Sequence, residues 1–131
     1  MSEIRIPIDA DADIVTARQR GRQLAADLGF TSIQLTLIAT AISELARNIL
    51  LYAKHGEIIL RTVQNSDKPG IVVVARDEGP GIFDLKQALQ VGYSTSGSLG
   101  LGLPGVRRLM SEFEIQSEQG KGTTVTVKKW K

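Results

Sequence analysis

The chain has 131 residues, of which 42% are hydrophobic and 23% charged, and this size and composition predict one globular domain with a hydrophobic core. The absence of cysteine excludes disulfides and thiolate metal sites, and the single histidine excludes a histidine cluster for zinc. The 16 Lys and Arg exceed the 14 Asp and Glu by two, and this net charge of +2 gives no reason to expect nucleic acid as a partner.

The chain begins with a predicted strand and helix. Residues 3–8 alternate apolar and polar side chains, which indicates a half-buried strand. Asp9 or Asp11 is expected to cap a helix that runs to about Leu28 and stops at Gly29.

A second helix is expected to be the central one. Thr31 or Ser32 would cap it, and it would run to about residue 52 or 54 and end at Gly56. At 1.5 Å per residue its length is roughly 35 Å, enough to cross a small domain. Its many apolar residues place it against the core.

The second half of the chain is rich in strands. Strands are expected at 58–63 and 71–75, joined as a hairpin through the turn residues 65–70. A loop-rich insert follows. The remaining expected elements are a short helix at 85–90, a helix that ends near 112, and strands at 114–117 and 123–129. This order predicts an α+β fold, a two-layer α/β sandwich in which helices cover one face of a mixed, largely antiparallel sheet.

Glu44 and Asn48 form the first candidate site on the central helix. Their spacing of four places both side chains on one face, one turn apart. A carboxylate there could take a proton or orient a nucleophile, and an amide oxygen could ligate a hard cation. The alternative is a solvent-facing polar pair. Because most of residues 41–51 are apolar, Glu44 and Asn48 are instead expected to be buried polar groups that each have a specific hydrogen-bond partner.

The motif Asp77-x-Gly79-x-Gly81 directly follows an apolar strand. A carboxylate at the end of a strand can accept a hydrogen bond from an exocyclic amine such as that of adenine, and the glycines leave room for a flat ring. The alternative is an ordinary turn, since Asp, Gly and Pro all favour turns.

Residues 92–105 are rich in glycine and hydroxyl side chains and run into a helix in which Pro104 suits the first turn. Backbone amides of such a loop, with the helix N-terminus, can bind phosphate, while the alternative is a mobile surface loop. Further on, the motif of residues 120–124 could bring a hydroxyl of the last strand back toward Asp77. A tight hairpin would explain that motif equally well.

The order of these motifs resembles the Bergerat-fold (GHKL) ATPases and kinases over about residues 40–126. That family has Glu-x-x-x-Asn on a helix, Asp-x-Gly-x-Gly after a strand, a glycine-rich loop before a helix, and Gly-x-Gly-Thr before the last strand. The segments 42–49, 92–97 and 100–106 look most like the stressosome switch kinases, small serine/threonine kinases of bacterial partner-switching pathways.

The resemblance implies ATP and Mg²⁺ as cofactors and a role for each motif. Glu44 corresponds to the base or orienter of the attacking group, Asn48 to the Mg²⁺ ligand, and Asp77 to the residue that contacts the adenine amine. The remaining positions implied to bind ATP are Gly79 and Gly81 beside the base, Thr123 near the aspartate, and Ser96, Gly97, Gly100, Leu101, Gly102 and Leu103 around the phosphates.

The resemblance also implies partners. These are STAS-domain antagonist and scaffold proteins as phosphate acceptors, and a downstream regulator such as a PP2C phosphatase. The alternative is an anti-sigma factor or another nucleotide-gated binding module without significant kinase turnover. A cation for the γ-phosphate would come from Arg47, Arg107, Arg108 or Lys121, or amides and Mg²⁺ would suffice.

We expect a cytoplasmic protein without a membrane segment. No stretch approaches about 18 uninterrupted apolar residues, and the N-terminus does not have the basic and then apolar order of a signal peptide.

Overall fold

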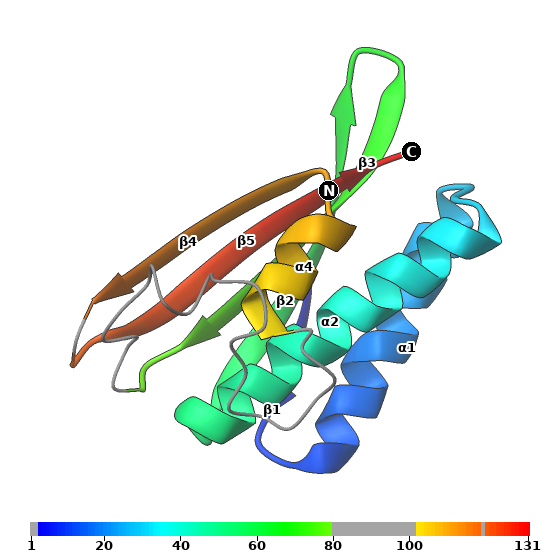
Figure 1. The fold of residues 1–131 in the computed structure, drawn as a ribbon. Helices are drawn as coiled ribbons and strands as arrows, with labels where there is room; N and C mark the ends of the chain where they lie inside the picture. Colours follow the sequence, from blue (N-terminus) through cyan, green and yellow to red (C-terminus); the bar gives the residue numbers. More distant parts are fainter. Residues whose placement is uncertain (1–2, 80–101, 119) are drawn as a thin grey trace.

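The computed structural model describes residues 3–79, 102–118 and 120–131 and shows a two-layer α+β fold, as predicted (Figure 1). Helices α1 (Asp11–Asp27), α2 (Ser32–Tyr52) and α4 (Gly102–Leu109) lie on one face of a five-stranded sheet. The strands are β1 (Ile4–Ile8), β2 (Gly56–Asn65), β3 (Lys68–Asp77), β4 (Glu112–Glu118) and β5 (Gly122–Trp130). The predicted helix at 85–90 lies outside the described residues.

The strands are ordered β1-β2-β3-β5-β4, and each pair of neighbours is antiparallel. Strands β3 and β4 run in the same direction, but β5 lies between them and is antiparallel to both. The expectation of a mixed sheet is therefore refined to an antiparallel sheet in the described part of the chain. The register pairs Asp77 at the end of β3 with Thr123 at the start of β5, which brings two of the candidate site residues together.

The main core lies between the helices and the sheet. Helix α2 supplies much of it, because the apolar side chains at Ile38, Ile42, Leu45 and Ile49 fall on one face and are almost completely buried. By length and hydropathy alone α2 could cross a membrane. Its packing in this core accounts for the same apolar content.

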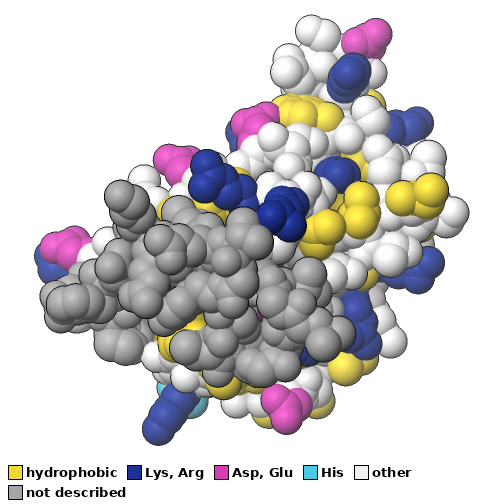
Figure 2. Space-filling view, viewed as in Figure 1, with side chains coloured by type: hydrophobic (Ala, Val, Ile, Leu, Met, Phe, Trp, Pro, Cys, Tyr) yellow, Lys and Arg dark blue, Asp and Glu magenta, His cyan; other side chains and the backbone are white. Residues whose placement is uncertain are grey.

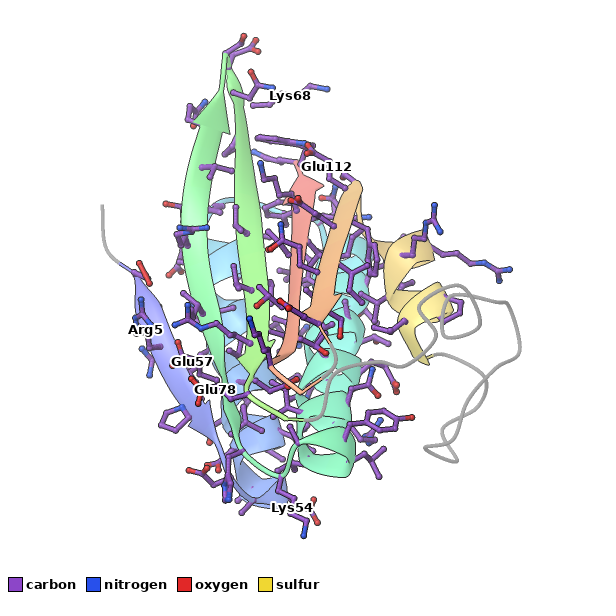
Figure 3. The ribbon with its side chains drawn as sticks, turned by 90° about the vertical axis from the view of Figure 1, so that its left-hand side faces the viewer. Arg5, Lys54, Glu57, Lys68, Glu78 and Glu112 are labelled. Atoms are coloured by element: carbon purple, nitrogen blue, oxygen red, sulfur yellow. The ribbon has the colours of Figure 1, made fainter. Side chains whose placement is uncertain are left out.

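The opposite face of the sheet carries a small apolar cluster under charged side chains. Ile59, Val72 and Val74 are buried there, although no described helix covers this face. Arg5 and Arg76 both contact Glu57 Oε1, at 2.7 and 3.0 Å, and Figure 3 shows Arg5 and Glu57 side by side on β1 and β2. The aliphatic stems of such side chains can shield apolar neighbours from water.

The capping prediction for α1 is wrong. The cap residue is Ala10, and the carboxylate of Asp13 accepts hydrogen bonds from the amides of Asp9 and Ala10 at 2.9 and 3.0 Å. An acidic residue in the first turn thus satisfies the free amides from inside the helix. The predicted stop at Gly29 is confirmed, since this residue follows α1 with a φ of 89° that glycine adopts readily.

Several predicted boundaries shift by a few residues. The hairpin turn is tighter than expected, because the strands extend to Asn65 and Lys68. Helix α4 ends at Leu109, short of the predicted residue 112. Two hydrogen bonds to β5 hold the end of α4: Lys129 Nζ donates to the Leu109 carbonyl at 2.7 Å, and the Ser111 amide donates to the Lys128 carbonyl at 2.8 Å. The chain therefore joins the sheet before residue 112.

The predicted cap of α2 is confirmed at Thr31. Its hydroxyl accepts from the Gln34 amide at 3.2 Å, and the Gln34 side chain accepts from the Thr31 amide at 2.9 Å. We expect Thr31→Ala to lower the free energy of unfolding by about 1 kcal/mol, measured by urea denaturation. The matched control is Thr36→Ala, whose hydroxyl only donates to the Ser32 carbonyl within the helix. A loss at Thr36 as large as at Thr31 would contradict the capping role.

Candidate active site

Glu44 is buried on α2 beside an arginine. Its side chain is 3% exposed, and among the described residues only Ser43 and Glu44 are buried polar or charged residues. Arg47 Nη1 donates to Glu44 Oε1 at 2.7 Å. The alternative of a solvent-facing pair is therefore wrong for Glu44, and a buried charge with a dedicated partner is typical of a functional group.

A cleft between α1 and α2 opens onto Glu44. It has a volume of about 560 Å³ and is lined by Arg18, Gln19, Arg22, Thr36, Ala39, Thr40, Ser43, Glu44 and Arg47. Arg18 and Arg22 form no ion pair with the part of the chain that the structure describes. The cleft thus presents positive charge next to a buried carboxylate.

Sequence reasoning missed Arg18 and Arg22. They lie one turn apart on α1, and an i,i+4 arginine pair is more often part of a solvated helix face. The signal that could have identified them is the absence of an acidic residue on the same stretch of α1, between Asp13 and Asp27.

Asp77 is held at the end of β3 by two amides. Its Oδ1 accepts from the Gly79 amide at 2.9 Å and from the Thr123 amide at 3.2 Å. The hydroxyl of Thr123 lies 2.9 Å from the Ser117 hydroxyl, so the expected contact to Asp77 comes from the Thr123 backbone instead. Asp77 Oδ2 accepts no hydrogen bond from the described residues. One carboxylate oxygen fixes the side chain and the other can receive a ligand donor.

Gly79 brings the Asp77 loop against the end of α2. A Cβ at this position would lie 2.5 Å from the Ala53 Cβ and 2.8 Å from its Cα, closer than atoms can approach. The glycine is therefore needed for packing against the helix. This contact places Asp77 near the same end of α2 as Asn48.

Of the glycine-rich loop predicted to bind phosphate at residues 92–105, the structure describes only residues 102–105. Gly102 and Leu103 begin α4 and are buried, and Pro104 lies in its first turn as expected. The predicted site residues Gly81, Ser96, Gly97, Gly100 and Leu101 lie outside the described residues.

The candidate cations for a phosphate differ in their surroundings. Arg47 is engaged by Glu44, and Lys121 Nζ lies 3.3 Å from Glu118 Oε1. Arg107 and Arg108 are exposed in the last turn of α4. In the view of Figure 2, basic side chains of the described residues are interspersed with acidic ones and form no continuous basic surface.

The residues fit Mg²⁺ and a nucleotide. Within the described residues, no group of three or more His, Cys, Asp or Glu side chains could hold a metal alone. Mg²⁺ in nucleotide sites usually takes only one or two protein oxygens and completes its shell with phosphates and water, which suits the half-buried amide of Asn48. The Oδ2 oxygen of Asp77 suits the amine of adenine.

Comparison with known proteins matches the histidine kinase-like ATPase domain to residues 6–129. The chain is 50% identical to the serine/threonine-protein kinase RsbT of Bacillus subtilis over 125 residues, covering 95% of this chain and 94% of that protein. It is 35% identical to the anti-sigma F factor of Caldanaerobacter subterraneus over 112 residues, covering 81% and 77% of the two chains.

The fold is also similar to a solved structure of the mycobacterial sensor histidine kinase MprB. The TM-score is 0.56 at 17% identity, and the match covers 97% of each chain. This agrees with the fold expected from the order of the sequence motifs.

Proposed function

Because this chain belongs to the histidine kinase-like ATPase family and is a protein serine/threonine kinase, we propose that it acts in a partner-switching stress-response (stressosome) pathway of the bacterial cytoplasm. It transfers the γ-phosphate of Mg-ATP to a serine or threonine of a STAS-domain antagonist or scaffold protein. The observation that carries this proposal is the buried carboxylate of Glu44 at the base of an open cleft, on the same helix as Asn48.

Different residues are proposed to bind the nucleotide and to assist phosphate transfer. Asp77 Oδ2 would accept a hydrogen bond from the adenine amine, Asn48 would hold Mg²⁺, and residues 96–103, most of which lie outside the described residues, would bind the phosphates. Bound Mg²⁺ neutralises charge on the phosphates. Glu44 accepts or orients the proton of the acceptor hydroxyl, so that positioning and charge stabilisation supply most of the rate.

The cleft between α1 and α2 is the route of the acceptor to Glu44. Glu44 lines this cleft, and the guanidinium groups of Arg18 and Arg22 have no ion-pair partner among the described residues. Acidic side chains next to the acceptor serine or threonine would complement this charge.

We expect the double variant Arg18→Ala/Arg22→Ala to raise the KM for the acceptor protein by roughly 10-fold while kcat and the Kd for Mg-ATP stay within about 3-fold. Initial-rate kinetics with a STAS-domain acceptor measure this. The matched control is Arg20→Ala, an exposed arginine of α1 that does not line the cleft. Equal KM values for the double variant and the wild type would rule out this route.

When it is not bound to its antagonist, the kinase binds and activates a downstream regulator such as a PP2C phosphatase. The similarity to anti-sigma F factors keeps a second candidate function, in which nucleotide gates the binding of a sigma factor. Co-purification with a sigma factor, in place of a STAS-domain protein or phosphatase, would favour that function.

The decisive test is incubation of the protein with Mg²⁺, γ-labelled ATP and a STAS-domain protein encoded beside it, followed by mass spectrometry to locate the phosphate. Phosphate on a serine or threonine of the STAS protein is the expected result. Bound ATP without transfer would favour the nucleotide-gated binding module.

A further inference from the structure

We propose that Arg47 is a positioning residue for phosphoryl transfer: it fixes the carboxylate of Glu44 in the orientation that receives the acceptor hydroxyl. The inference rests on the proposed role of Glu44 and assigns Arg47 to the base, as opposed to the phosphates or the acceptor protein.

The contact is direct and lies on one turn of helix. Arg47 Nη1 donates to Glu44 Oε1 at 2.7 Å, and the two residues are three positions apart on α2. A charge-assisted hydrogen bond of this length is among the stronger ones in proteins. Because it engages one carboxylate oxygen, it restricts rotation of the carboxylate.

The two partners differ in exposure. The Glu44 side chain is 3% exposed, whereas the Arg47 side chain is 38% exposed. Both line the cleft between α1 and α2. Arg47 therefore reaches from the cleft surface to a carboxylate that water hardly touches, and it places a positive charge beside that carboxylate.

Arg47 also lies next to Asn48 in the sequence, but the two side chains point in different directions around the helix, 100° apart. Substitution of Arg47 should therefore disturb Glu44 more than it disturbs Asn48. The consequence is a fall in kcat with little change in ATP binding.

The test compares Arg47→Met, which keeps an unbranched apolar stem without the charge, with Arg47→Lys, which keeps the charge without the planar fork. We expect Arg47→Met to lower kcat for STAS-protein phosphorylation by roughly 10- to 100-fold, with both KM values and the Kd for Mg-ATP within about 3-fold of wild type. Arg47→Lys should restore a large part of kcat. The exposed Arg20→Met on α1 is the matched control.

A double variant separates positioning from other roles. If Arg47 acts through Glu44, Glu44→Gln/Arg47→Met should be no slower than Glu44→Gln alone, because the effects of residues acting as a unit are not additive. A purely structural role would lower the melting temperature of Arg47→Met and leave kcat per folded molecule unchanged. That result, or full additivity in the double variant, would overturn the proposal.

Measurements on the wild-type protein distinguish failure of the proposed kinase function from failure of the proposed role of Arg47. If it transfers no phosphate to the STAS protein, the proposed kinase function itself fails. If it transfers phosphate and Arg47→Met does so at the same kcat, only the role of Arg47 fails.

Discussion

Glu44→Gln is expected to lower the rate of phosphate transfer to the acceptor by roughly 10²- to 10⁴-fold while ATP binding stays nearly unchanged. Gln has almost the shape of Glu, and its oxygen can still accept the hydrogen bond that Arg47 donates at 2.7 Å. It lacks the negative charge and cannot take a proton from the acceptor hydroxyl. Single-turnover transfer from γ-labelled ATP measures the loss, and calorimetry with Mg-ATP measures binding.

Glu57→Gln is the matched control for Glu44→Gln. Glu57 makes the same kind of contact, with Arg5 at 2.7 Å and Arg76 at 3.0 Å, but it lies on the sheet face opposite the helices. The same chemical change there should leave transfer within about 3-fold of wild type. Transfer by Glu44→Gln at the wild-type rate would remove Glu44 from the reaction.

The parts of the fold that follow local rules could be predicted from the sequence. Thr31 with Gln34 forms a cap from side chains within one turn, and Gly29 supplies a positive φ where a helix must end. The cap of α1 does not follow from the sequence, because three aspartates lie close together and only the folded geometry shows that Asp13 reaches back to the amides of Asp9 and Ala10.

The candidate site could be predicted where a motif or the spacing within one element carries it, as for Asp77 with Thr123 and for Glu44 with Asn48. The spacing of Glu44 and Asn48 on α2 is a property of the helix itself. The cleft with Arg18 and Arg22 exists only once α1 packs on α2, and the need for glycine at position 79 depends on its contact with Ala53. Such contacts between distant segments leave no periodic signal in the sequence.

Asp77→Asn is expected to weaken ATP binding by about 1.5–3 kcal/mol, or roughly 10- to 150-fold in Kd. Asn can keep an oxygen toward the amides of Gly79 and Thr123, so the fold should remain intact. Its amide nitrogen then replaces Oδ2 and presents a donor to the donor amine of adenine. Calorimetry measures Kd, and Asp67→Asn in the exposed β2–β3 turn is the matched control.

Inosine triphosphate tests whether the contact of Asp77 with the base is direct, because it carries an acceptor oxygen where adenine has its amine. The wild-type protein should bind ATP more tightly than inosine triphosphate, since the carboxylate and that oxygen would both be acceptors. In Asp77→Asn the preference should shrink or reverse, because the Asn amide can donate to the oxygen. If Asp77→Asn left both the Kd for ATP and the preference for ATP over inosine triphosphate unchanged, Asp77 would lie outside the adenine site. If the variant bound both nucleotides more weakly by the same factor, Asp77 would only shape the pocket through the amides that it holds.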